Sequence, residues 1–457
     1  MNGGQGTAQD GGVIGSGPVA QITIPATRRS ASSRVFRILL APVKLFWGMA
    51  FCQGLAGSIL VVGWTYRLAQ RSALKFWWAR SGERRGAFQD FLADDPETRG
   101  HHCWPNWFWR QDARDTLKRP EGMSLARFSG RILSAPVASF WSNYWIGLKG
   151  ILTTWTLTLP ACVLWWFGWY DGWNNSFNKG YEQAPVGPLI SIAGIFLFIA
   201  VMCYVPLAQA RQAVTGEWRS FYEFRLIWSI VRLRWLACAG LALFYAVLAL
   251  PLNILKTMPM FFLQNHPEFA DLAAPQLLKI LNGYFFWCAL VMFPAFVVLR
   301  LAAARIYASG LLSLVRAGRV PAGALTGLEG GALRRLGLLE ARPEPARHRL
   351  VRLVTWAGTR VGRTVSRVAL VLIWFGFVAQ IYVNEFLHYH GAGGWLNQPL
   401  VQLPWFHYLP ARLKNPAGDI LFAIFLLLLF SLIASVTRAF PGRVGDHPGR
   451  AGGDATH

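Results

Sequence analysis

Residues 235–255, WLACAGLALFYAVLALPLNIL, decide the fold class of this chain. The stretch contains no acidic, basic or histidine residue, and about 20 apolar residues are enough for an α-helix to cross a bilayer. Five further stretches have a similar length and few charges: 148–169, 186–208, 284–303, 368–387 and 419–437. The sequence therefore predicts an all-α polytopic membrane protein with about six transmembrane helices.

The composition of the whole chain agrees with this fold class. Of its 457 residues, 54% are hydrophobic and 15% are charged, whereas about 25% charged residues is usual in soluble domains. These values exclude an ordinary soluble domain and a disordered chain. Arginine outnumbers lysine and alanine is abundant, as in proteins encoded by GC-rich bacterial genomes. We therefore expect a protein of the bacterial cytoplasmic (inner) membrane.

The charge of the connecting segments alternates along the chain. Residues 208–234 and 300–367 are rich in arginine, whereas 170–185, 256–283 and 388–418 carry few charges of either sign. Because basic loops remain on the cytoplasmic side of a membrane, the arginine-rich segments and the C-terminus are predicted to be cytoplasmic.

The apolar segment 45–66 does not fit this alternation, because lysine and arginine lie on both sides of it. Residues 37–65 recur in order at 131–156, with single-residue gaps, which indicates a duplicated element. If both copies enter the membrane from the cytoplasm, the first must return to that side. Two interpretations remain open: a re-entrant helical pair that turns near Gly54 and Gly57, or a seventh span with the N-terminus outside.

Prolines fall inside four of the predicted spans, at Pro160, Pro206, Pro251 and Pro294. Proline removes a backbone donor and clashes with the preceding helical turn, so each one bends its helix. The bends are either static features or hinges of the kind found in transporters built from broken helices.

Groups that could carry catalysis or a cofactor are scarce. The span interiors contain almost no ionisable residue and no histidine; Glu385, near the outer end of its span, is the nearest exception, and we expect it to reach headgroup water. The chain has no phosphate-binding loop, nucleophile elbow, zinc-protease helix or haem-attachment motif. We therefore predict no catalytic residue and no cofactor.

One polar loop carries the adjacent residues His101, His102 and Cys103, which are weak candidates for zinc or copper ligands. Neighbouring residues of an extended chain point to alternating sides, and no second ligand set lies at a zinc-site spacing. The aromatic residues that follow are of the type that settles at a membrane interface. We expect lipid or partner contact at Trp104, Trp107 and Trp109.

The segment 211–234 combines arginine with aromatic residues and is predicted to be an amphipathic helix. Because it lies between two spans, it is placed to meet anionic lipid headgroups and not nucleic acid. We expect lipid or partner contact at Arg219, Arg225, Arg232 and Arg234.

The outer loop 388–418 is rich in aromatic residues and histidine. Its apolar part, 400–406, is predicted to lie flat on the outer interface with its apolar side toward the lipid. Trp395 and Trp405 are the residues that we expect to contact lipid or a partner here.

The predicted organisation is a disordered N-terminal tail over 1–33, a helical transmembrane domain over 34–437 and a disordered C-terminal tail over 438–457. From the scarcity of chemical groups we expect a structural or accessory subunit without catalytic activity, which docks a membrane-protein partner or a second copy of itself. The alternative is a transporter of a neutral or amphipathic, lipid-like solute, and a third hypothesis is a metal-dependent membrane enzyme.

Overall fold

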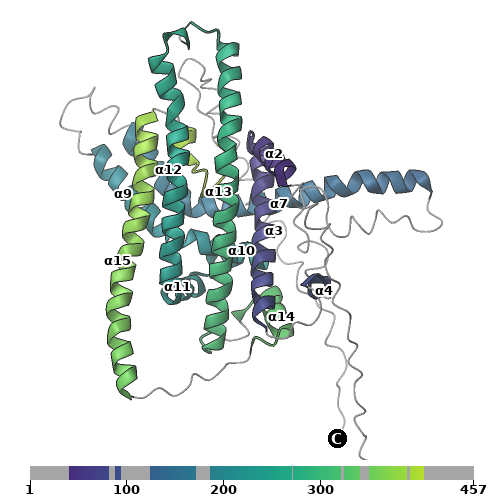
Figure 1. Cartoon of the computed structure of the whole chain (residues 1–457), viewed down its shortest axis with the longest axis vertical. Coiled ribbons are helices and arrows are strands. Elements are labelled where there is room, and N and C mark those ends of the chain that lie inside the picture. Colours follow the sequence, from purple (N-terminus) through teal and green to yellow (C-terminus); the bar gives the residue numbers. More distant parts are fainter. Residues whose placement is uncertain are drawn as a thin grey trace, which may run out of the picture.

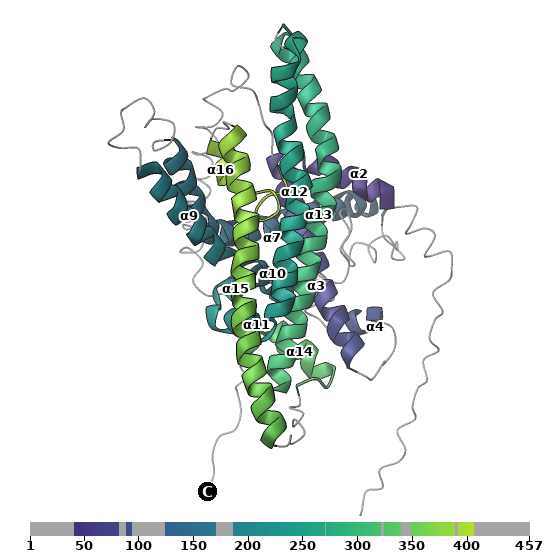
Figure 2. The same cartoon turned by 60° about the vertical axis from the view of Figure 1, so that its left-hand side comes forward.

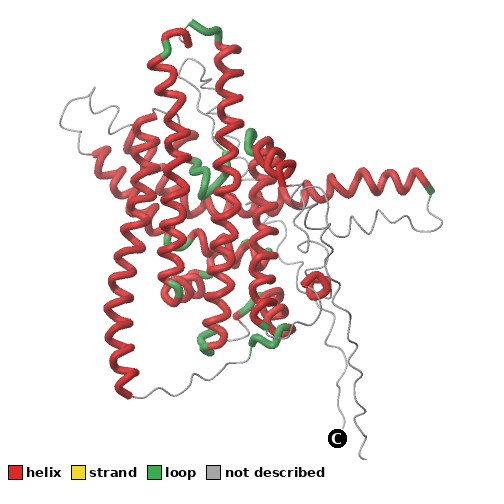
Figure 3. The backbone as a smooth tube through the Cα atoms, viewed as in Figure 1, coloured by secondary structure: helices red, strands yellow, loops and turns green. Residues whose placement is uncertain are grey.

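The computed structural model describes residues 41–81, 88–93, 124–170, 186–269, 271–320, 324–339, 349–388 and 392–405. These residues form helices joined by turns and loops, with no β-strand among them (Figure 3). The all-α prediction is therefore confirmed for the described part of the chain. The predicted tails 1–33 and 438–457 and the predicted span 419–437 lie outside it.

Four long helices run side by side and form one layer (Figure 1). In spatial order they are α3 (Leu55–Arg80), α13 (Ala274–Arg316), α12 (Trp235–Asn265) and α15 (Arg349–His388). The helices α12 and α13 form a hairpin whose tip contains η4 (Pro267–Phe269). Two short helices, α11 (Phe224–Leu233) and α14 (Gly327–Arg335), lie at the opposite end of the layer (Figure 2).

A fifth long helix, α7 (Leu125–Phe167), runs across this layer instead of along it (Figures 1 and 2). It packs against α3, and two glycines form the crossing. A Cβ atom on Gly63 would lie 1.7 Å from the carbonyl oxygen of Asn143, and one on Gly147 would lie 1.9 Å from that of Ile59. The two backbones therefore touch, an approach that only residues without a side chain permit.

Within the described residues, five helical stretches are long and apolar enough to cross a membrane: Val137–Tyr170, Val186–Thr215, Trp235–Pro259, Ala274–Arg316 and Arg367–Phe386. Each contains, or nearly coincides with, one of the predicted spans. The chain therefore has the helices of a multi-pass membrane protein, although α7 differs in direction from the others.

The segment 45–66 forms neither a single helix nor a symmetric re-entrant pair. The helix α2 (Ala41–Phe51) ends before a turn, and α3 begins after Gly54, whose backbone is extended. The turn lies where the re-entrant hypothesis placed it. However, α3 continues for 26 residues, or about 39 Å, so it extends well beyond residue 66, where the re-entrant hypothesis ends the second half.

The span predicted over 186–208 is broken. The helix α9 (Val186–Met202) ends before Cys203 and Tyr204, and α10 (Val205–Thr215) begins directly after them, with Pro206 in its first turn. A proline is tolerated there because the first backbone N–H groups of a helix have no partner within the helix. By contrast, Pro294 lies inside a continuous α13. Of these two prolines, only Pro206 accompanies a break.

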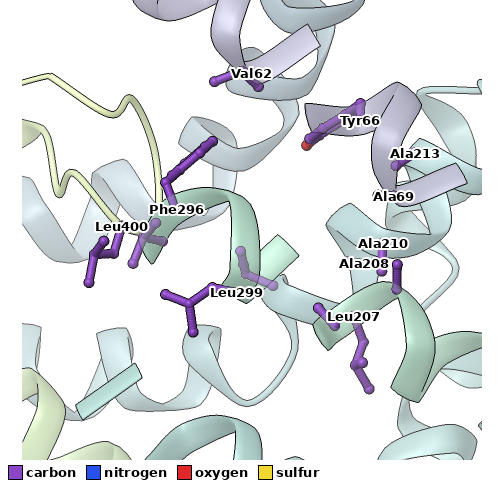
Figure 4. Packing of buried hydrophobic residues seen from close by; sticks show 14 of the residues in the cluster. Val62, Tyr66, Ala69, Leu207, Ala208, Ala210, Ala213, Phe296, Leu299 and Leu400 are labelled. Atoms are coloured by element: carbon purple, nitrogen blue, oxygen red, sulfur yellow. The ribbon is translucent and has the colours of Figure 1, made fainter. Parts of the chain in front are cut away.

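All eleven residues of α10 are buried. Figure 4 shows its Leu207, Ala208, Ala210 and Ala213 near α3 and α13. Small side chains on α10 let both long helices approach it, so this short helix occupies the middle of the molecule. The buried hydrophobic residues that surround it include Val62, Tyr66 and Ala69 of α3 and Phe296 and Leu299 of α13.

The chain after α15 folds back into the bundle. It forms α16 (Ala392–Leu396) and then the irregular segment 397–405, in which Leu400, Val401 and Leu403 are at most 4% exposed. Figure 4 shows Leu400 beside Phe296 of α13. The prediction that 400–406 lies flat on the outer interface is therefore wrong for the described residues. An apolar segment of this length is equally suited to a protein interior, and here its backbone finds partners there.

Candidate functional site: a buried polar centre

The backbone carbonyl of Val401 joins three structural elements. Arg300 on α13 donates a hydrogen bond from Nη2 to this oxygen over 2.6 Å, and Gln209 on α10 donates a second from Nε2 over 3.1 Å. The side chains of Arg300 and Gln209 are 3% and 2% exposed. Irregular backbone inside a membrane protein needs such partners, because no water or helical turn satisfies it.

The transverse helix α7 contributes two threonines to the same region. Thr154 accepts a hydrogen bond from Gln209 Nε2 over 2.7 Å, and Thr158 accepts one from Gln402 Nε2 over 2.7 Å. Residues four apart lie on one face of a helix, so both hydroxyls face the same neighbours. We call these buried groups the polar centre: Thr154, Thr158, Gln209, Arg300, Val401 and Gln402.

Two amide side chains give the segment 397–405 its shape. Asn397 Nδ2 donates to the carbonyl oxygens of Leu403 and Trp405 over 3.2 and 2.7 Å, and its Oδ1 accepts from the Leu403 N–H over 3.1 Å. Gln402 Oε1 accepts from the N–H of Gln398 over 2.5 Å. These bonds replace the contacts that a helix would make within itself. The segment is therefore a defined structure and not a loosely packed loop.

Arg300 brings a positive charge into the polar centre. Its guanidinium carbon lies 4.7 Å from the ring centroid of Phe296, and it forms no ion pair with any residue that the structure describes. Carbonyl and aromatic contacts compensate a buried cation only in part. An ionisable group kept at such a cost inside a membrane protein is a candidate for a functional site.

A second buried charge lies between α12 and α15. Lys256 and Glu385 form an ion pair and are 2% and 0% exposed. The expectation that Glu385 reaches headgroup water is therefore wrong. The helix α12 runs on to Asn265, so Lys256, which the sequence placed in a loop, lies within the helical layer and faces the carboxylate.

A third set of charged side chains forms ion pairs at the arginine-rich end of the molecule. Arg211 lies 2.7 Å from Glu223 Oε2 and 3.7 Å from Glu329 Oε2, and Tyr307 donates a hydrogen bond to Glu329. Burial raises the pKa of the Glu223 carboxyl, and the guanidinium of Arg211 opposes that shift. Glu329 also completes a capping box with Thr326 at the start of α14. The cluster joins α10, α13 and α14.

The predicted amphipathic helix forms only over α11. Its buried residues are Ile227, Ile230 and Val231. Four arginines expected to contact lipid or a partner lie at the surface: Arg219, Arg225, Arg232 and Arg234. Arg234 also donates to Ser313 Oγ over 2.6 Å, which fixes the end of α11 to α13. Arg211, at the start of the predicted helix, is fully buried and belongs to α10.

Only two of the tryptophans that we expected to contact lipid or a partner lie within the described residues. Trp395, expected at a lipid or partner surface, is fully buried beside Trp165 and Trp169, and Trp405 is partly buried. The remaining candidates lie outside the described residues: His101, His102, Cys103, Trp104, Trp107 and Trp109. Among the residues that are described, no group of three or more His, Cys, Asp or Glu is arranged to hold a metal ion.

Sequence reasoning did not identify the polar centre. One signal was available, because Thr154 and Thr158 of α7 share a helix face, and Gln209 and Gln212 of α10 also lie one turn apart. Uncharged polar side chains repeated at helical spacing inside a span indicate a face that is turned away from lipid. The partner of these faces, 397–405, is nearly 200 residues away from Gln209 along the chain.

Comparison of the chain with protein-family models, with curated protein sequences and with solved structures found no match.

Proposed function

We propose that this chain is a membrane transporter of a neutral or amphipathic, lipid-like solute, and that the solute's polar part passes the polar centre. The observation that carries the proposal is the contact at the Val401 carbonyl, where an irregular segment meets the helix that follows a break. Transporters of several folds place their sites at discontinuous helices and unwound backbone.

The chemistry of the polar centre supports a polar, uncharged or anionic group as its ligand. Arg300 and the amide groups of Gln209 and Gln402 are donors, and the threonine hydroxyls can donate or accept. In this proposal α10 tilts relative to α9 at the break, that is at Cys203 and Tyr204. A small tilt of α10 would separate Gln209 from Val401.

Flux in reconstituted vesicles tests the proposal. The purified full chain is placed in liposomes that contain a phosphatidylglycerol labelled with a nitrobenzoxadiazole fluorophore, and dithionite then bleaches the label in the outer leaflet. In parallel, light scattering follows glycerol entry after an osmotic step. We expect protein-dependent movement of at least one of these probes, and a decrease of about tenfold or more in Gln209→Leu and Arg300→Met.

Matched controls separate the polar centre from general damage. Gln276→Leu and Arg319→Met make the same chemical changes at exposed positions and should leave flux unchanged. All variants are compared at equal reconstituted amounts and after size-exclusion chromatography. Movement of neither probe, or equal rates in the polar-centre and control variants, would contradict the transport proposal.

A structural or accessory role remains the second candidate, because one observation favours it. The N-terminal part of α7 projects away from the layer of long helices (Figure 1), and farther along the same helix Val137 and Trp141 are 68% and 65% exposed. A membrane helix of a partner or of a second copy would cover this part. Native mass determination after gentle detergent extraction distinguishes the roles, since an accessory subunit should be isolated with a stoichiometric partner.

We further propose that the chain resides in the bacterial inner membrane with six spans, 419–437 being the sixth, and with its C-terminus in the cytoplasm. The support is the arginine-rich α11 and α14, which lie together at one end of the long helices, opposite the α12–α13 hairpin (Figure 1). A membrane-impermeant thiol reagent should leave Cys103 unlabelled in intact spheroplasts, because residues 67–147 precede the first of the six spans and therefore lie in the cytoplasm in this orientation. Labelling would contradict this orientation.

A further inference from the structure

A cavity of about 210 Å³ lies between α3, α7 and α10. A single water molecule requires only about 15 Å³ on the same measure, so the cavity has room for a polyatomic group. The residues that line it are Tyr66, Arg67, Ser142, Ile146, Lys149, Gln212, Ala213 and Gly216.

Two of the lining residues are cations at different depths. Arg67 is 1% exposed and lies at the base of the cavity, whereas Lys149 and Gly216 are exposed at its mouth. The lining contains no Asp or Glu. The C-terminus of α10, which ends here, contributes the equivalent of only about half a negative charge. The lining residues themselves therefore carry a net positive charge.

Two neutral side chains of the lining, Ser142 and Gln212, can act as hydrogen-bond donors in the cavity. Arg67 Nη2 donates to Ser142 Oγ over 2.6 Å, which leaves the serine hydrogen to donate elsewhere. Gln212 Oε1 accepts from Thr153 Oγ1 over 2.7 Å, which leaves the amide Nε2 as the donor of Gln212. A ligand that fits this set has several acceptors, no donors of its own and a negative charge.

Aromatic side chains adjoin the mouth of the cavity. Trp145 is 38% exposed and Trp141, one turn away on α7, is 65% exposed, and Lys149 Nζ lies 5.8 Å from the ring centroid of Trp145. Indole rings settle at the level of lipid headgroups. A phosphate that enters between Lys149 and Gly216 could therefore keep its glycerol and acyl parts against these tryptophans.

We propose that this cavity binds a phosphate group, with Arg67 at its base and Lys149 at its mouth. The phosphate belongs either to an anionic phospholipid headgroup or to free inorganic phosphate, since both present the same oxygens to the same donors. The proposal concerns binding alone and does not depend on transport.

The experiment measures binding of each phosphate source to the purified full chain in detergent. Native mass spectrometry follows added phosphatidylglycerol, with phosphatidylcholine as a comparison, because Lys149 and Arg67 repel the choline cation. Equilibrium dialysis with radiolabelled inorganic phosphate follows the free anion. A charge-assisted hydrogen bond lost in Lys149→Ala should weaken binding of the true source about tenfold or more.

Three variants make the result specific to the cavity. Lys149→Arg keeps the charge and should retain binding, Ser142→Ala removes one donor and should weaken binding severalfold, and Lys279→Ala, at an exposed position on α13, should have no effect. Loss of phosphatidylglycerol binding in Lys149→Ala assigns the lipid, and loss of phosphate binding assigns the free anion. If neither ligand binds, or if Lys149→Ala and Lys279→Ala behave alike for both, the proposal is wrong.

Discussion

Replacing Glu385 with glutamine removes the carboxylate charge that faces Lys256 in a place where neither side chain is more than 2% exposed. Removing one partner of a buried ion pair costs about 3–5 kcal/mol, because the remaining charge stays in a medium that solvates it poorly. A Coulomb estimate agrees, since two unit charges about 4 Å apart attract by roughly 4 kcal/mol at an effective dielectric constant of about 20. We therefore expect Glu385→Gln to lower the free energy of unfolding by about 3–5 kcal/mol.

The double variant Lys256→Met with Glu385→Leu should be closer to the wild type than either single variant. With both charges removed, the attraction between α12 and α15 is lost. The free-energy cost of keeping two ions out of water is removed at the same time. The two positions are therefore strongly coupled, and the double-mutant cycle should give an interaction free energy of about 2 kcal/mol or more.

Unfolding of the full chain in detergent micelles by increasing amounts of sodium dodecyl sulfate, followed by tryptophan fluorescence, measures these differences. Glu385→Asp serves as a control that keeps the charge and shortens the side chain. The reasoning is refuted if Glu385→Gln costs less than about 1 kcal/mol, or if the effects of the two single variants simply add.

The same unfolding assay checks three further predictions. Gly63→Ala places a Cβ within 1.7 Å of a backbone oxygen of α7 and should destabilise strongly, whereas Gly240→Ala, which meets no atom within 4 Å, should stabilise by about 0.5–1 kcal/mol. A result in which both variants behave alike would exclude a tight crossing. Gln402→Leu leaves the buried N–H of Gln398 without its acceptor and should cost about 1–3 kcal/mol; a neutral effect would show that this side chain does not hold the segment 397–405. Burial raises the folded-state pKa of the Glu223 carboxyl above the ordinary value of 4.5. The stability that this group contributes is therefore present at low pH and is lost as the pH rises through the raised pKa. Glu223→Gln should flatten this part of the pH profile of the free energy of unfolding, and an unchanged profile would count against the pKa shift.

Much of the membrane architecture could be predicted from hydropathy, because each span is a local property of about 20 residues. The stretches 186–208, 235–255, 284–303 and 368–387 all lie within or largely overlap membrane-capable helices. Hydropathy alone did not give the direction of a helix. The transverse path of α7 results from its contact with α3 at two glycines, and such a contact is not visible in either sequence segment by itself.

The candidate site could not be predicted because the segments that form it resemble, in sequence, segments that do not. They differ only in the residues that surround them in the folded structure. Pro206 and Pro294 have similar neighbours, yet a break occurs only before α10, which is enclosed on all sides. An apolar run such as 400–405 suits an interface and an interior equally well. What places it inside is the set of donors on α10 and α13, and these become its neighbours only after folding.

The burial of 397–405 has a consequence for how the protein is made. A ribosome synthesises this segment after every other described element, so α7, α10 and α13 enter the membrane before the chain that satisfies them exists. Until then Arg300, Gln209 and Thr158 lack the acceptors and donors that the finished fold supplies. Insertion of this segment is therefore a late step of assembly, which follows the entry of α7, α10 and α13. In a nascent chain that stops before residue 392, the polar side chains of α7, α10 and α13 would lack these hydrogen-bond partners. Membrane quality-control proteases and chaperones can recognise such unsatisfied groups.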